Sequence, residues 1–370
     1  SFPTRRSSDL PATAPVTVDP VNGYDPAAAT APATPPATPR VDLYAFIHKA
    51  LRTMMFDTVQ RLGRMDPTDS TDLARTLGQF EDLMALCMIH NLQKRGACEL
   101  LAVTVTKDHP QAAAFVDAVN TLYGYPDTPI GVVRNGAAKE PGKFNLLADK
   151  HPHDLKSGAD APEAGDLIKD ILAKQPDGSV VIAQVGFFTN LARLMDDAEA
   201  KALIAKKVKM LSIMAGAFQT VNFDTRHLEY NVKLDVPAAQ KLAKEWPTPM
   251  VWSGFEIGVA AAFPHVVIEQ DLDYMPNHPL KDAYYLYNPP PHDRPTWDPT
   301  AVLYAIYPDR GYFDLSPPGN ITVENDSATL FRPVKKGTGK HRFLVMSPEQ
   351  ASRVREAIVQ LSVEPPPVKK

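Results

Sequence analysis

The sequence predicts an α/β fold in which a mainly parallel central sheet is flanked by helices. From residue 99 onward, short apolar runs alternate with segments of helical periodicity, as in a parallel sheet. The run at 99–106 is almost continuously apolar, which is typical of a strand covered on both faces. Two other runs, 210–214 and 249–253, are closed by glycine turns, as expected where a buried strand ends at a loop.

Composition excludes several classes of protein. The chain has 370 residues, 44% of them hydrophobic, and a formal net charge of −4, which gives no electrostatic reason to expect a nucleic-acid partner. Because the sequence has no run of eighteen apolar residues, we expect no membrane span. Cys87 and Cys98 have neither metal-binding nor redox spacing, which favours buried thiols.

The first 40 residues are not expected to fold. Residues 11–40 are almost entirely Pro, Ala, Thr and Val, which bury too little surface to offset their ordering entropy. Residues 1–10, SFPTRRSSDL, match the translation of a common sequencing-library adapter, and the alternative is an ordinary disordered N-terminus. We interpret residues 1–10 as a non-native addition and exclude them from fold reasoning.

Residues 41–86 predict a helical hairpin. An apolar stripe runs through 43–55, a turn follows at 66–70, and Ser70 or Thr71 caps a second helix. Residues 41–90 resemble the first two helices of a hemerythrin-like domain, with His48 at a ligand position of that family. Iron binding is rejected, because His90 is followed by Lys94 rather than by a glutamate, and the remaining two helices are absent.

The following strands and helices alternate to the end of the chain. We expect strands within 99–106, 127–133, 179–185, 210–214 and 249–253, with helices at 110–123, 162–174, from 188 and from 235, where Asp235 is the N-cap. Helices at 278–287 and 298–307, short strands within 312–331, and a strand at 342–346 follow. Ser347 and Gln350 fit a capping box that starts a helix ending near residue 361.

The same segments, in order, resemble the inosine/uridine-preferring nucleoside hydrolase family over about residues 85–307, extending to 362. The matching motifs are KDHPQAAAFVDAVNTLYGYPDTPIGVVRNG, VVIAQVGFFTNLARL, IMAGAF, EYNVKLDVPAAQKL and RPTWDPTAVLYA. The resemblance implies calcium-assisted hydrolysis of a ribonucleoside to base and ribose. It also implies a small-molecule nucleoside as ligand and leaves a homo-oligomer open.

The resemblance implies five site residues at the carboxyl ends of the strands. Glu229 and Asn231 would hold the sugar hydroxyls; on extended chain, side chains two residues apart point to the same side. Asp82, Asp298 and the backbone carbonyl of Thr189 would bind Ca²⁺. The alternatives are that Asp298 is only a helix N-cap and that Asn231 is a satisfied amide at the sheet edge.

One part of the family pattern is missing. The family supplies most of its calcium-binding carboxylates from an Asp-x-Asp…Asp-Asp motif on its first strand, and residues 73–82 have a helical pattern instead. No catalytic residue is therefore assigned, calcium binding is expected to be weak, and the chain is expected to be inactive. The alternative function is a catalytically inactive nucleoside- or sugar-binding protein. We interpret the chain as a chimaera joined between residues 82 and 92, with a hairpin (41–86), a hydrolase-like domain (87–362) and a disordered tail (363–370).

Overall fold

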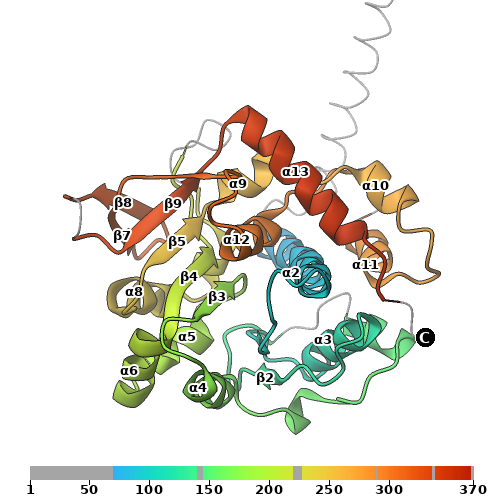
Figure 1. Cartoon of the computed structure of the whole chain (residues 1–370), viewed down its shortest axis with the longest axis horizontal. Helices are drawn as coiled ribbons and strands as arrows, with labels where there is room; N and C mark the ends of the chain where they lie inside the picture. Colours follow the sequence, from blue (N-terminus) through green and yellow to red (C-terminus); the bar gives the residue numbers. More distant parts are fainter. Residues whose placement is uncertain (1–69, 140–144, 220–226, 289, 336–337, 368–370) are drawn as a thin grey trace, which may run out of the picture. The chain divides into compact units, whose positions relative to one another are not determined.

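The computed structural model describes residues 70–139, 145–219, 227–288, 290–335 and 338–367 (Figure 1). The segments expected at 1–40 and 41–62 lie outside these residues. Up to the fourth strand, the elements are α2 (Ser70–Lys94), β1 (Val103–Val105), α3 (Pro110–Leu122), β2 (Ile130–Val132), two short 3₁₀ helices (Asn145–Lys150 and Gly158–Asp160), α4 (Ala164–Lys174), β3 (Val180–Gln184), α5 (Thr189–Leu194), α6 (Ala198–Lys207) and β4 (Val208–Met214).

The remaining elements complete the sheet and cover it. They are α7 (Tyr230–Leu234), α8 (Val236–Glu245), β5 (Met250–Ser253), α9 (Phe255–Ala260), α10 (His265–Gln270), α11 (Pro279–Tyr287), α12 (Trp297–Ile306), β6 (Asp314–Leu315), β7 (Gly319–Val323), β8 (Thr329–Pro333), β9 (His341–Val345) and α13 (Pro348–Val363). Of these helices, none is long and apolar enough to cross a lipid bilayer, within the part of the chain that is described.

The main sheet has seven strands and is parallel through its centre, as the sequence predicts. Its order is β3-β4-β5-β9-β7-β8, and β6 pairs with β9 from outside this path. β3, β4, β5 and β9 run parallel, whereas β7 and β8 form an antiparallel hairpin. The predicted strands at 179–185, 210–214 and 249–253 are therefore confirmed as neighbours.

Helices cover both faces of this sheet (Figure 1). One face carries the apolar side chains that pack under α5, α6 and α8, among them Leu211, Ile213 and Trp252. The other face lies under α12, which packs in turn against α2, and Val251 and Leu344 join the larger core there. Alternate residues of the strands thus enter different cores, as the period of two in a strand requires.

α2 is an integral part of the larger core. Its side chains from Phe80 to Leu92 are mostly buried, and Phe80 packs against Tyr284 of α11. The Asn91 amide donates to the carbonyls of Leu361 (2.8 Å) and Glu364 (3.0 Å), which ties α2 to the end of α13. The boundary expected between residues 86 and 87 falls inside this helix.

One strand does not join the sheet for which it was predicted. Residues 100–106 were expected in the main sheet, but β1 covers Val103–Val105 and pairs only with β2, in a separate two-stranded parallel sheet. A ladder requires strands about 4.8 Å apart. β1 and β3 instead line a common cavity of about 1150 Å³, and no strand of the described residues lies between them.

Two predicted helix starts are confirmed. The Asp235 carboxylate accepts from the Ala238 amide (3.3 Å) and caps α8. Ser347 and Gln350 form the predicted capping box at the start of α13. Both caps satisfy amides that have no partner inside the helix.

Candidate functional site at the carboxyl ends of the strands

α12 is fixed across the carboxyl ends of the central strands by buried hydroxyl groups. Ser212 of β4 donates to the Ala301 carbonyl (2.7 Å), and the hydroxyls of Ser253 and Thr300 are 2.8 Å apart. Asp298 therefore sits over the sheet edge in the first turn of α12. The residue at the N-cap position is Thr296, so Asp298 is not the cap of this helix.

Asp298 and Asp82 form the central pair of the site. Asp298 is 3% exposed, Asp82 is partly buried, and their carboxyl groups hydrogen-bond to each other. Loss of solvent raises the pKa of Asp82 to about 7, and burial together with the Asp82 charge raises the pKa of Asp298 well above its usual range. Burial and the closeness of the two carboxyl groups therefore both favour protonated forms over the doubly charged pair.

Glu229 belongs to the same electrostatic group but is held by backbone amides. Its charge contributes to the raised pKa of Asp298, and burial raises the pKa of Glu229 itself to about 7. The carboxyl group accepts from the amides of Asn231 (2.9 Å), Val232 (3.2 Å) and Gly216 (3.2 Å). Glu229 is thus the N-cap of α7.

The expectation that Glu229 and Asn231 lie on extended chain is wrong. Asn231 is in the first turn of α7, because the Glu229 carboxyl group caps a helix there. The Asn231 side-chain amide donates to the carbonyls of Val185 (2.9 Å) and Met214 (3.2 Å). It therefore bridges the ends of β3 and β4, as expected if Asn231 is a satisfied amide at the sheet edge.

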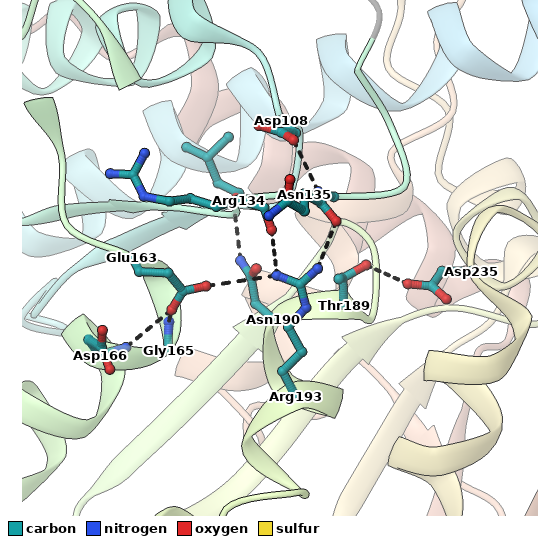
Figure 2. Close-up of polar contacts among 12 residues, drawn as sticks. Asp108, Arg134, Asn135, Glu163, Gly165, Asp166, Thr189, Asn190, Arg193 and Asp235 are labelled. Carbon is teal, nitrogen blue, oxygen red and sulfur yellow. Dashed lines mark hydrogen bonds and ion pairs between the residues drawn. The ribbon is translucent and has the colours of Figure 1, made fainter. Parts of the chain in front are cut away.

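Thr189 opens a neighbouring polar network around α5 (Figure 2). Its hydroxyl donates to Asp235 (2.5 Å), the residue that caps α8. Asn190 donates to the Val105 carbonyl of β1 (3.1 Å). Arg193 donates to the carbonyls of Arg134 (2.6 Å) and Asn135 (2.8 Å). Figure 2 shows its guanidinium directed at these two residues.

Two further acidic residues lie near the site, the half-buried Glu256, which the sequence reasoning did not assign, and the buried Glu81, which with Asp82 stands where the family has its paired aspartates. Glu256 follows β5 and accepts from the Phe218 amide (3.3 Å), and burial raises its pKa to about 7. Its position directly after a predicted strand was the available signal. Glu81 forms an ion pair with Arg294, and both side chains are at most 4% exposed. No local pattern indicates this second contact, because its partners are 213 positions apart.

An aromatic group stands beside the carboxyl pair. The rings of Trp297 and Phe255 are 4.9 Å apart, and the indole donates to the Phe255 carbonyl (2.9 Å). The ring of His227 lies 3.8 Å from that of Phe255. Trp297 is buried against Met214 and Ala301, whereas Phe255 and His227 are half-buried.

The described residues supply only part of a divalent-cation site. Asp82 and Asp298 offer two carboxyl groups, and the buried Oδ2 of Asp298 has no hydrogen-bond partner within the described part of the chain. Calcium requires six to eight oxygen ligands. Over the same residues, no three His, Cys, Asp or Glu side chains are grouped so that they could hold a metal ion.

Comparison with known proteins assigns the chain to a group of enzymes. A family model described as inosine-uridine preferring nucleoside hydrolase matches residues 76–356. An uncharacterized protein of Schizosaccharomyces pombe is 29% identical over 177 residues. That alignment covers 44% of this chain and 54% of the relative, so the chain spans about half of the relative's length.

Solved structures share the fold. A plant nucleoside hydrolase is similar with a TM-score of 0.61 and 20% identity, covering 78% of this chain and 97% of its own. A purine-preferring ribonucleoside hydrolase from Gardnerella vaginalis gives 0.59 and 18%, covering 77% and 97%. An inosine-uridine preferring nucleoside hydrolase from Bacillus anthracis gives 0.58 and 18%, covering 77% and 96%.

Proposed function

Since the chain belongs to the inosine-uridine preferring nucleoside hydrolase family, we propose that its carboxyl-edge site binds a ribonucleoside. The reaction class of such a site is hydrolysis of the N-glycosidic bond to base and ribose. The observation that carries the proposal is that Asp298 and Glu229 both lie near the carboxyl end of β4. Trp297, next to Asp298, packs against Met214, and Glu229 accepts from the Gly216 amide. The half-buried ring of Phe255, which packs against the buried Trp297, suits the flat face of a base.

The protonation of the carboxyl groups decides what the site can do. N-glycosidic cleavage passes through an oxocarbenium-like sugar, so ionised carboxylates near the sugar favour the transition state. Burial and mutual repulsion oppose the doubly charged state of Asp82 and Asp298, which raises the pKa of both carboxyl groups. A protonated carboxyl group neither stabilises positive charge nor takes a proton from water. We therefore propose that hydrolysis is impaired in this chain.

The same groups limit the metal that the resemblance implies. Asp82 and Asp298 would hold Ca²⁺ together with the Thr189 carbonyl, and these ligands fit only part of a coordination sphere. Binding must also displace protons from these carboxyl groups, which makes it weaker as pH falls. We propose that Ca²⁺ binds weakly here and assign it no step in a reaction.

The test compares turnover with binding. Purified chain is incubated with inosine or uridine, with and without Ca²⁺, and released ribose is measured as reducing sugar. We expect no measurable release, whereas isothermal titration with inosine should detect binding that Asp298→Ala weakens. Turnover that disappears in Asp298→Ala would contradict the proposed impairment, because the site would then be complete without further carboxylates.

The alternative function, a nucleoside- or sugar-binding protein without turnover, is favoured by the same raised pKa values of Asp82 and Asp298. Titrations with ribose and with inosine distinguish a sugar-binding protein from a nucleoside-binding protein. Binding of ribose alone would indicate a sugar site, while a requirement for inosine would indicate that the ring of Phe255 also contacts a base.

A further inference from the structure

We propose that Thr329 is a positioning residue for Glu229, acting through the turn that follows β4. Thr329 begins β8 and lies 112 positions along the chain from Ala217 of this turn. Its hydroxyl accepts from the Ala217 amide (3.0 Å) and donates to the Ala217 carbonyl (3.1 Å). The amide of Gly216, one residue earlier, holds the Glu229 carboxyl group (3.2 Å). The inference rests on the proposed function, because Glu229 is the group that would bind the sugar.

The backbone of the turn is shaped so that the Thr329 hydroxyl can reach it. Gly216 has a φ of +76°, in the left-handed region that residues with a side chain rarely adopt. A Cβ atom at this position would lie 2.8 Å from the Thr329 hydroxyl oxygen, so the glycine leaves room for the hydroxyl group. The Gly216 carbonyl accepts from the Phe255 amide of α9 (2.8 Å). The turn is therefore held between the β7–β8 hairpin and the start of α9.

Glu256 holds the third residue of the same turn. Its carboxyl group accepts from the Phe218 amide (3.3 Å). A Cβ atom at Gly254 would lie 2.6 Å from a carboxyl oxygen of Glu256, so the glycine allows this side chain to fold back over its own backbone. Three successive amides of the turn thus donate to the side chains of Glu229, Thr329 and Glu256. Thr329 holds the middle one, and its loss should release the turn on both sides.

The turn contributes to the charge state of Glu229. Burial raises the pKa of Glu229 to about 7, and hydrogen bonds from the amides of Asn231, Gly216 and Val232 act in the opposite direction. The bonds from Asn231 and Val232 belong to the cap of α7, whereas the Gly216 bond comes from the turn. The charge of Asp298 faces the same group. If the turn moves, Glu229 loses the Gly216 bond to its ionised form, and its pKa should rise.

The experiment compares Thr329→Val with Thr329→Ser in the full chain. Valine keeps the branched shape but removes both hydrogen bonds to Ala217, whereas serine keeps the hydroxyl group. Thr322→Val, at an exposed position of the neighbouring strand β7, is the matched control. Glutamate labelled with ¹³C at the carboxyl group gives the pKa of Glu229 by NMR titration, and Glu229→Gln identifies the signal by its loss. Isothermal titration with inosine gives the affinity.

We expect Thr329→Val to raise the pKa of Glu229 and to weaken inosine binding about tenfold, as for the loss of one hydrogen bond to a charged group. Thr329→Ser and Thr322→Val should change neither quantity. A second pair of variants applies even if Thr329→Val does not fold. Glu256→Met should raise the pKa of Glu229 relative to Glu256→Gln, because both remove the same charge and only glutamine keeps an oxygen acceptor for the turn.

Three results would overturn the proposal. The first is an unchanged pKa of Glu229 in Thr329→Val with equal values in the two Glu256 variants, even if Tm falls. The second is the same rise in Thr329→Ser, since the hydroxyl group would then not be responsible. The third is a raised pKa with unchanged inosine affinity. If the unaltered chain does not bind inosine, the proposed function itself is contradicted, and the pKa comparison still decides whether Thr329 positions Glu229.

Discussion

Replacing Arg294 by methionine should destabilise the protein strongly, because it leaves Glu81 buried without its partner. Glu81 is 0% and the Arg294 side chain 4% exposed, and the Arg294 guanidinium also lies 3.9 Å from the Tyr287 ring. Breaking one side of a buried pair costs about 3–5 kcal/mol. That is a large fraction of the roughly 5–15 kcal/mol that stabilises a typical domain.

The cost should depend on pH in a defined direction. Burial raises the pKa of Glu81 to about 7 even beside Arg294. Below this value Glu81 is largely neutral and loses little when the arginine is removed. Above it, the native protein gains the charged pair, which the variant cannot form. The free-energy loss of Arg294→Met should therefore be greater near pH 8 than near pH 6.

Urea denaturation at these two pH values measures the loss, and a double-mutant cycle with Glu81→Met isolates the pair. We expect the double variant to be more stable than Arg294→Met alone, because no buried charge remains. Arg332→Met, at an exposed position of β8, is the matched control and should change stability by less than about 0.5 kcal/mol. A loss below about 1 kcal/mol for Arg294→Met at pH 8 would refute the reasoning and would show that α2 is not fixed to the domain by this contact.

Three further changes test other parts of the site. Because the pKa values of Asp82 and Asp298 are raised in the folded protein, these groups contribute stability at pH values below the ordinary carboxyl pKa, and that stability is lost as pH rises toward 7 and above. The Tm of the native protein, measured in thermal scans, should therefore fall over this pH interval. Asp298→Asn should make Tm depend less on pH. Asp235→Ala removes the cap of α8 and the acceptor of a neighbouring hydroxyl, and urea denaturation should show a loss of about 1–2 kcal/mol. Gly258→Ala would place a Cβ atom 2.6 Å from the Cα of Trp297, which should cost about 1–3 kcal/mol of stability. Calorimetry should therefore show a lower Tm for this variant. An unchanged Tm would mean that α9 and α12 can separate at no cost.

Much of the fold could be predicted because its signals are local. The strands at 179–185, 210–214 and 249–253 are short apolar runs closed by turns, and the caps at Asp235 and Ser347 use side chains within three residues of the amides they bind. Such features depend on periodicity and capping alone. The sequence therefore located most elements close to their observed bounds.

The failures arise from contacts between distant segments or from competing local bonds. The local sequence of residues 100–106 does not determine which strand pairs with them, so their separation from the main sheet could not be predicted. Asn231 was expected on extended chain together with Glu229, yet the Glu229 carboxyl group caps α7 and Asn231 lies in the first turn of that helix. The raised pKa values of Asp82 and Asp298 depend on the burial of their carboxyl groups, which cannot be read from the local sequence.

The two outer edges of the seven-stranded sheet differ in how well they are protected against unwanted association. β8, at one end of the sheet order, carries Arg332 and Pro333 and is followed by Lys335, and both charge and a missing amide oppose pairing with another copy. β3, at the opposite end, has the sequence VVIAQ, with neither charge nor proline. A conformational change that moves β1 and β2 away from β3 would expose this edge. Aggregation of the protein under stress should therefore start at β3 rather than at β8.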